Sequence, residues 1–136
     1  MPTMTNRTKG SIIIPADLYV WEHELHTVRA LAKAGYVVEF LPAKTAKHTK
    51  SPDILMDGTK WEIKSPVAQK LSAIERNLKR AYHQSTNIVF DSQRMGRLPD
   101  KSIQKELAKQ FKLTKNIKRM LFVNRKRKII DVSSLI

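Results

Sequence analysis

An Asp57-Gly58 pair between two short apolar runs is the clearest local pattern in the chain. Asp-Gly between strand-like runs is the strongest short-range signal for a β-hairpin. A two-residue loop pairs Ile54 with Trp61 across the hairpin and places Asp53 directly opposite Glu62. The sequence therefore predicts a hairpin that carries two facing carboxylates.

Apolar periodicity predicts further helices and strands on both sides of this hairpin. Apolar residues from Trp21 to Ala32 recur at three- and four-residue spacing, which predicts a helix with Asp17 as its N-cap and Gly35 at its end. The stripe from Leu71 to Tyr82 predicts a second helix in the same way. The predicted elements are a strand at 11–15, a helix at 17–34, a strand at 36–41, the hairpin at 53–64, a helix at 67–85, a strand at 87–91, a helix at 100–113, and strands at 119–124 and 128–132.

This order of elements predicts an α/β fold in which helices flank a mixed central sheet. The length of 136 residues suits one domain with a core of its own. We expect residues 1–16 to form a lead-in and residues 17–136 to form the domain.

Composition restricts the classes of function. The chain has 26 basic and 12 acidic residues, a formal net charge of +14, which predicts a polyanionic partner and most simply nucleic acid. A basic soluble protein without such a partner is the alternative. With no cysteine, disulfides and thiolate zinc sites are excluded, and a reducing cytoplasm is a suitable setting. No apolar run approaches the length of a membrane span, and no signal peptide is apparent, so no membrane role is expected.

The facing carboxylates of Asp53 and Glu62 predict a cation site. Like charges roughly 5 Å apart at Cβ repel each other unless a cation lies between them, and a divalent metal ion meets that need. Lys64 lies on the same face of the strand as Glu62. Glu24 falls beside the buried stripe of the first helix, where a carboxylate needs a cation as its partner. A boundary glutamate paired with a lysine is the alternative for Glu24.

Several basic and polar residues are candidates for substrate contacts. Residues 43–51 are rich in basic side chains, so this segment either contacts phosphates or is a solvated loop. The basic turn at 125–127 leaves the same two alternatives. The candidates for substrate binding are Lys44, Lys47, Lys50, Lys60 and Gln84.

One stretch of the chain resembles the core of the PD-(D/E)XK nuclease superfamily. It contains Pro52-Asp53, a short hairpin and then Glu62-x-Lys64. The resemblance implies that Asp53 and Glu62 hold a divalent metal ion at the scissile phosphate, while Lys64 orients or activates the attacking water. A glutamate on a preceding helix often completes such sites, and this role would fall to Glu24.

A second set of motifs resembles one branch of that superfamily. The motifs are His23-Glu24, Ala30-Leu31, Gly35-Tyr36, Val38–Pro42, Trp61–Ser65, Tyr82–Ser85 and Ile117–Arg119. They are similar to the C-terminal tRNA-nuclease toxin domain of CdiA-type contact-dependent growth inhibition proteins. This resemblance implies a metal-dependent ribonuclease that cleaves tRNA in the cytoplasm and is blocked by a cognate immunity protein. The chain would be either a delivered part of a larger protein or free-standing.

Oxygen ligands favour Mg²⁺, with Mn²⁺ as an alternative, while His23, His26 and His83 keep Zn²⁺ open. One rival function within the superfamily is a Holliday-junction resolvase, which would be a homodimer, or another DNA endonuclease. A rival from a different class is a non-catalytic nucleic-acid-binding module in which the acidic pair is structural.

Overall fold

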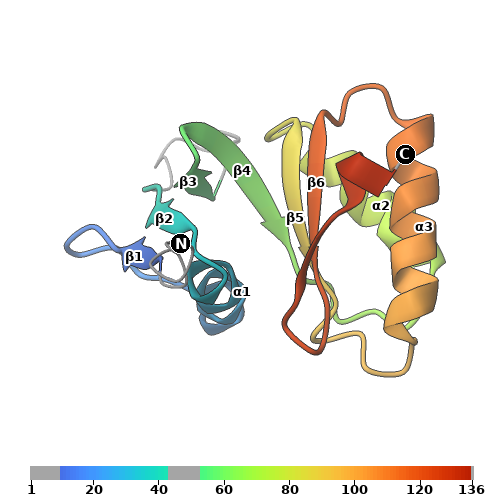
Figure 1. Ribbon diagram of the computed structural model, residues 1–136, viewed down its shortest axis with the longest axis horizontal. Coiled ribbons are helices and arrows are strands. Elements are labelled where there is room, and N and C mark those ends of the chain that lie inside the picture. Colours follow the sequence, from blue (N-terminus) through green and yellow to red (C-terminus); the bar gives the residue numbers. More distant parts are fainter. Residues whose placement is uncertain (1–9, 43–52, 136) are drawn as a thin grey trace, which may run out of the picture.

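The strands of the central sheet lie side by side in the order in which they occur along the chain (Figure 1). This computed structural model describes residues 10–42 and 53–135. Within those residues a seven-stranded mixed sheet and three α-helices form one domain, which confirms the predicted α/β class with a mixed sheet flanked by helices. The strands are β1 (Ser11–Ile13), β2 (Val37–Phe40), β3 (Ile54–Met56), β4 (Thr59–Lys64), β5 (Asn87–Asp91), β6 (Arg119–Val123) and β7 (Ile129–Asp131).

The β3–β4 hairpin has the predicted loop and the predicted register. Asp57 and Gly58 both have positive φ angles, 54° and 70°, as a type I′ turn requires. Ile54 pairs with Trp61, and the antiparallel register continues through Met56 opposite Thr59. β4 then pairs in parallel with β5, so the hairpin joins the antiparallel strands β2 and β3 to the parallel strands β5 and β6.

The helices cover both faces of the sheet and enclose two cores. Helix α1 (Glu22–Lys33) covers one face, while α2 (Ser72–Ala81) and α3 (Asp100–Leu113) cover the other, as Figure 1 shows. Alternation along β5 sends Val89 to the α1 side and Ile88 and Phe90 to the α2 and α3 side. A short 3₁₀ helix, η2 (Val132–Leu135), follows β7 and packs near α3.

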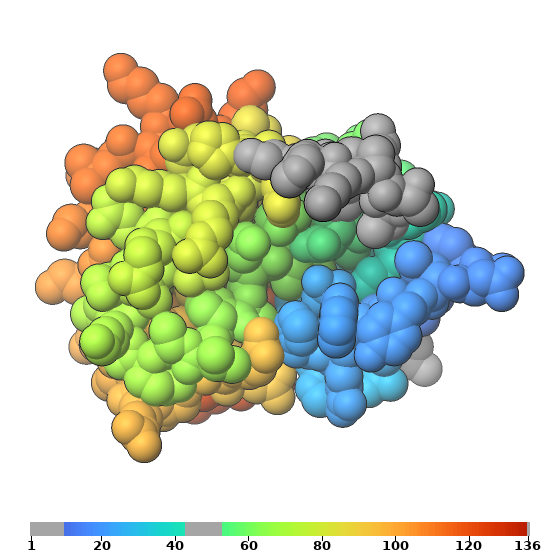
Figure 2. Space-filling view, turned by 180° about the vertical axis from the view of Figure 1, so that it is seen from behind, coloured from blue at the N-terminus to red at the C-terminus, as the bar shows by residue number. Residues whose placement is uncertain are grey.

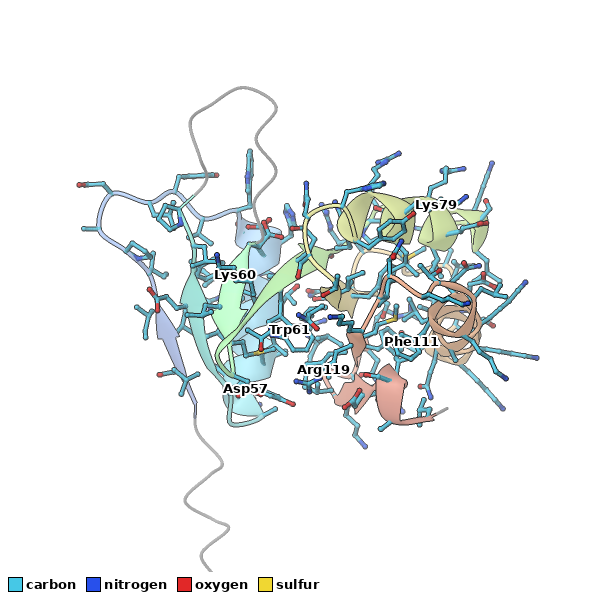
Figure 3. All side chains as sticks on the ribbon, turned by 90° about the horizontal axis from the view of Figure 1, so that it is seen from above. Asp57, Lys60, Trp61, Lys79, Phe111 and Arg119 are labelled. Carbon is cyan, nitrogen blue, oxygen red and sulfur yellow. The ribbon has the colours of Figure 1, made fainter. Side chains whose placement is uncertain are left out.

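Trp61 of β4 is fully buried in the core beneath α1, although its indole N–H is polar. The indole nitrogen donates a hydrogen bond to the Met56 carbonyl at 3.0 Å, which satisfies this donor within the hairpin itself. The guanidinium carbon of Arg119 on β6 lies 5.0 Å from the Trp61 ring centroid, and Figure 3 shows the two side chains next to each other. The hydrogen bond stabilises the hairpin itself, and the Arg119 contact links it to β6.

Two predicted helices begin later than expected. α1 begins at Glu22, because residues 18–21 are extended and Asp17 lies in a turn with a φ angle of 64°. α2 begins at Ser72 and ends at Ala81, because residues 65–69 have no regular secondary structure and Lys70 and Leu71 form a bend and a turn before the helix. The predicted role of Asp17 as an N-cap is therefore wrong, while Gly35 does end α1, with a φ angle of 107°. None of the described helices combines the length and the apolar character that a membrane span needs.

Candidate active site

Asp53 directly precedes β3, and its side chain is tied to the neighbouring strand β4. One carboxylate oxygen, Oδ2, accepts a hydrogen bond from the backbone N–H of Ile63 at 2.8 Å. The backbone N–H of Asp53 donates to the Trp61 carbonyl at 3.0 Å. The hairpin backbone therefore holds this carboxyl group in place beside β4.

Glu62 lies on β4 next to this group, and only 4% of its surface is exposed. Its carboxyl group lies close enough to that of Asp53 for each to shift the pKa of the other. The Lys64 ammonium lies 3.4 Å from Glu62 Oε2, so the lysine predicted on the same face does reach the acidic pair. The structure thus brings Asp53, Glu62 and Lys64 together, as the sequence predicted.

Glu24 of α1 lies near the same pair. Its electrostatic interactions include both Asp53 and Lys64. Glu24 and Asp53 also line a common cavity of about 140 Å³. Figure 2 shows the face on which the blue N-terminal segment and the green hairpin meet. We call Glu24, Asp53 and Glu62 the carboxyl cluster.

The carboxyl cluster is electrostatically strained. Burial, and then the nearby charge of Asp53, raise the pKa of Glu62 to about 8 and that of Glu24 to about 7. Burial also raises the pKa of Asp53, although the Ile63 N–H and Lys64 oppose the shift. One lysine is therefore too little positive charge for three partly buried carboxyl groups, and the cluster favours an additional cation or protons.

The donor set of the cluster suits a hard divalent cation. Buried carboxylate oxygens that repel each other are the ligands that Mg²⁺ and Mn²⁺ take in proteins. Asp53 and Glu62, whose carboxyl groups influence each other's pKa, would be the two direct ligands. Within residues 10–42 and 53–135, no three His, Cys, Asp or Glu side chains are grouped closely enough to bind one ion together. Other ligands would therefore come from water or from the substrate.

Gln84, a predicted substrate-site residue, contacts Glu62. With its amide nitrogen turned toward the carboxyl group, Gln84 donates hydrogen bonds to both oxygens of Glu62, at 2.7 Å to Oε1 and closer to Oε2. Gln84 follows α2, and its backbone N–H is held by the Ala81 carbonyl. Gln84 and Lys64 therefore both contact the Glu62 carboxyl group and can orient it.

The other predicted residues are divided between the site and its surroundings. Lys60 is exposed on β4 and lies on the hairpin in Figure 3. Among the histidines, His23 interacts electrostatically with Asp53, and burial lowers its pKa. His26 instead approaches Glu22 at 3.8 Å, and His83 packs against Tyr82. Lys44, Lys47 and Lys50 lie outside the described residues.

A buried ion pair near α1 was not predicted from the sequence. Asp91, at the end of β5, is fully buried, and its two carboxylate oxygens accept hydrogen bonds from Arg127 Nη1 and Nη2, both at 2.8 Å. Thr27 Oγ1 of α1 donates to the same carboxylate at 2.6 Å, and the Gln93 N–H donates at 2.8 Å. We call these four residues the Asp91 clamp. An aspartate that directly follows the apolar run Ile88–Phe90 was the only sequence signal for it.

The clamp also decides the role of the basic turn at 125–127. Arg127 is bound to Asp91, and Arg125 lies 3.6 Å from an Asp100 carboxylate oxygen and donates to the Met95 carbonyl. Both arginines are therefore engaged within the fold, and only Lys126 of the turn is exposed.

With this geometry established, comparison with known proteins identifies the family. Residues 50–129, more than half of the chain, match the family model for the contact-dependent growth inhibition CdiA C-terminal domain. The chain belongs to this family. CdiA C-terminal domains are toxins of contact-dependent growth inhibition, which confirms the family resemblance and the toxin class expected from the sequence.

The fold is also similar to that of a solved member of the same system. The structure matches a chain described as a CdiA-CT/CdiI toxin and immunity complex from Burkholderia pseudomallei, with a TM-score of 0.63 and 17% sequence identity. The match covers 90% of this chain and 98% of the other. At this identity the match shows a shared fold. No curated protein matches the sequence.

Proposed function

We propose that this CdiA C-terminal domain is a metal-dependent ribonuclease that cleaves tRNA. The observation that carries the proposal is the hairpin register, which brings Asp53 beside Glu62 on neighbouring strands, with Lys64 at 3.4 Å from Glu62. The raised pKa values of Glu62 and Glu24 support it, because perturbed carboxyl groups that face one another are typical of functional sites. The net charge of +14 suits a substrate with many phosphates.

The order of elements supports the PD-(D/E)XK interpretation. A helix with Glu24 precedes the antiparallel strands, the hairpin then carries Asp53, Glu62 and Lys64, and an α-β unit follows as α2 and β5. The parallel pairing of β4 with β5 places the α2 end, where Gln84 lies, beside Glu62. Motif and topology therefore agree in this chain.

The roles of the residues follow from their contacts. Asp53 and Glu62 would hold the metal ion, which supplies Lewis-acid polarisation of the phosphate and lowers the pKa of a bound water. The Lys64 ammonium, anchored by Glu62, would position that water or stabilise negative charge on the phosphate. Gln84 fixes the orientation of the Glu62 carboxyl group. Glu24 adds negative charge beside Asp53 once it is ionised.

Cleavage assays with matched variants test the proposal. Total RNA, purified tRNA, plasmid DNA and a four-way DNA junction are incubated with wild type, Glu62→Gln and Lys64→Ala, in Mg²⁺, Mn²⁺, Zn²⁺ or EDTA. We expect discrete tRNA products that require both the metal and Glu62. Cleavage of DNA alone would reject the ribonuclease function in favour of a DNA endonuclease or a dimeric resolvase. Binding without any cleavage would favour a non-catalytic module.

We further propose that a cognate immunity protein inhibits the domain after its delivery into the cytoplasm of a target cell as part of a larger protein. Membership of the family and the likeness to a toxin and immunity complex support a partner of this kind. Titration of the cleavage assay with the product of an adjacent open reading frame tests this. Stoichiometric inhibition is expected, and unchanged cleavage would reject that candidate partner.

A further inference from the structure

Residues 18–21 form an extended segment that presents two aromatic side chains to solvent. Leu18 and Val20 point inward and pack against the core beneath α1. Tyr19 and Trp21 alternate with them and are 73% and 58% exposed. Alternation along an extended chain explains this division, since the inward residues anchor the segment and leave both rings outside. The exposure of the rings is therefore fixed by the fold.

The two rings are arranged as a surface. Their centroids lie 5.2 Å apart with an angle of 87° between the ring planes, and the His23 ring lies nearly parallel to Trp21 at a centroid distance of 6.4 Å. Trp61, the other tryptophan of the chain, is fully buried. Solvent exposure of large aromatic side chains costs apolar burial and is therefore a sign of binding.

This aromatic surface borders the carboxyl cluster. Tyr19, Trp21, Glu24 and Asp53 all line the same cavity of about 140 Å³. Phe40, the last residue of β2, and the adjacent Leu41 also line this cavity. A substrate whose phosphate lies at Asp53 would therefore have its adjoining group beside the two rings.

We propose that Tyr19 and Trp21 form a stacking platform for an unpaired nucleobase next to the scissile phosphate. The inference rests on the proposed nuclease function and narrows its substrate class to single-stranded or looped RNA. Aromatic side chains beside a backbone-binding site are the usual means of holding unpaired bases, because every base offers a π face. A polyanionic occupant also agrees with the charge of +14, which a basic or neutral protein partner would not exploit.

The experiment separates base stacking from phosphate binding. The full chain carries Glu62→Gln to prevent cleavage, and it binds two fluorescent probes in Mg²⁺: a short single-stranded RNA and an abasic oligomer of the same length. Tyr19→Leu/Trp21→Leu removes both rings and keeps apolar side chains, while Tyr19→Phe/Trp21→Phe is the matched control that keeps two aromatic rings. Thermal unfolding of each variant checks that the fold is intact.

We expect the chain with both rings to prefer the RNA to the abasic oligomer by about tenfold or more, given the usual contribution of stacked bases. The leucine variant should lose that preference while its affinity for the abasic oligomer stays the same, and the phenylalanine variant should keep most of it. RNA should also shield Trp21 fluorescence from acrylamide, with Trp21→Leu as the blank, because Trp61 is already buried.

Three other results would overturn the inference. If the Tyr19→Leu/Trp21→Leu variant prefers the RNA to the abasic oligomer as strongly as the chain with both rings, the rings do not hold a base. Unchanged RNA binding with a loss of immunity-protein binding would assign the surface to that partner. No binding of either probe by any variant would reject the stacking platform together with the nucleic-acid function. Cleavage that survives Glu62→Gln would instead reject the proposed active site while leaving the stacking result interpretable.

Discussion

Two sites with acidic side chains lie close to α1, and their carboxyl groups receive very different numbers of hydrogen bonds and ion pairs. In the Asp91 clamp, one carboxylate receives two hydrogen bonds from Arg127, one from Thr27 and one from the Gln93 N–H. In the carboxyl cluster, three acidic groups share one lysine and one backbone N–H, and Gln84 contacts Glu62. Asp91 and Glu62 are both buried, so burial alone does not explain the difference between these two side chains.

The contrast separates a charge that is satisfied within the fold from charges that are not. A buried carboxylate with a full set of donors has no capacity for a ligand, and it holds elements together. A buried group of carboxylates with too few donors keeps its pKa values high and has an affinity for a cation. Removal of a charge should therefore have opposite consequences in the two places.

The largest effect is expected for cleavage by variants of the cluster. Glu62→Gln and Asp53→Asn should each reduce tRNA cleavage by about a thousandfold or more, because loss of a metal ligand removes several kcal/mol of transition-state stabilisation. Neither variant should be less stable than wild type. Single-turnover cleavage and urea unfolding measure both quantities, and near-normal cleavage by either variant would show that this site is wrong.

A large loss of stability is expected when the clamp is broken. Arg127→Ala leaves the fully buried Asp91 without its guanidinium partner and should lower the free energy of unfolding by about 3 kcal/mol. Urea unfolding measures the change, with Lys126→Ala as the control because Lys126 is exposed in the same turn. A loss below about 1 kcal/mol would show that the clamp contributes no more than a surface ion pair.

The pH dependence of the free energy of unfolding should reveal the raised pKa of Glu62, with a smaller effect than the loss of the clamp. The Glu62 pKa is raised from 4.5 to about 8, so its folded state holds a proton that the unfolded state releases. This contribution to stability is complete below pH 4.5 and disappears as the pH rises through 8. In EDTA, wild type should therefore lose stability relative to Glu62→Gln between about pH 5 and 8. Parallel pH profiles of thermal unfolding would contradict this, and Mg²⁺ or Mn²⁺ should reduce the difference.

The smallest effect is expected from Gln84. Gln84→Ala removes the amide that orients Glu62 and should reduce cleavage by about tenfold, in the range usual for groups that support a metal ligand. The Mg²⁺ concentration needed for half-maximal activity should rise at the same time. Ser85→Ala, which alters a hydrogen bond to the Lys60 carbonyl, is the neighbouring control. An unchanged Mg²⁺ requirement would restrict Gln84 to a packing role.

The sequence predicted the hairpin and its carboxylates because their signals are local. Asp57-Gly58 is chemically suited to the positive φ angles of a type I′ turn, and that turn sets the register of β3 against β4. Once the register is set, alternation places Glu62 and Lys64 on one face. The strand Asn87–Asp91 and the helix Asp100–Leu113 were likewise predicted with the bounds found in the structure.

Features that depend on tertiary contacts were not predictable in this way. Trp21 continues the helical spacing of α1, yet the chain there is extended because Leu18 and Val20 pack into the core at alternate positions. The clamp joins Asp91 to Arg127 across 36 positions, and no local pattern records such a pairing. The contact of Gln84 with Glu62 similarly required the parallel pairing of β4 with β5.

The order of the strands bears on how the domain reaches its folded state. Every strand pairs with its neighbours in the chain, so no strand has to be inserted between two that are already paired. Such a sheet can grow by successive addition, and the loop closed at each addition is shorter than an insertion would require. The family is described as a C-terminal domain, and therefore as one part of a longer polypeptide. A sheet of this kind can form the β3–β4 hairpin from contacts between strands that are neighbours within the domain.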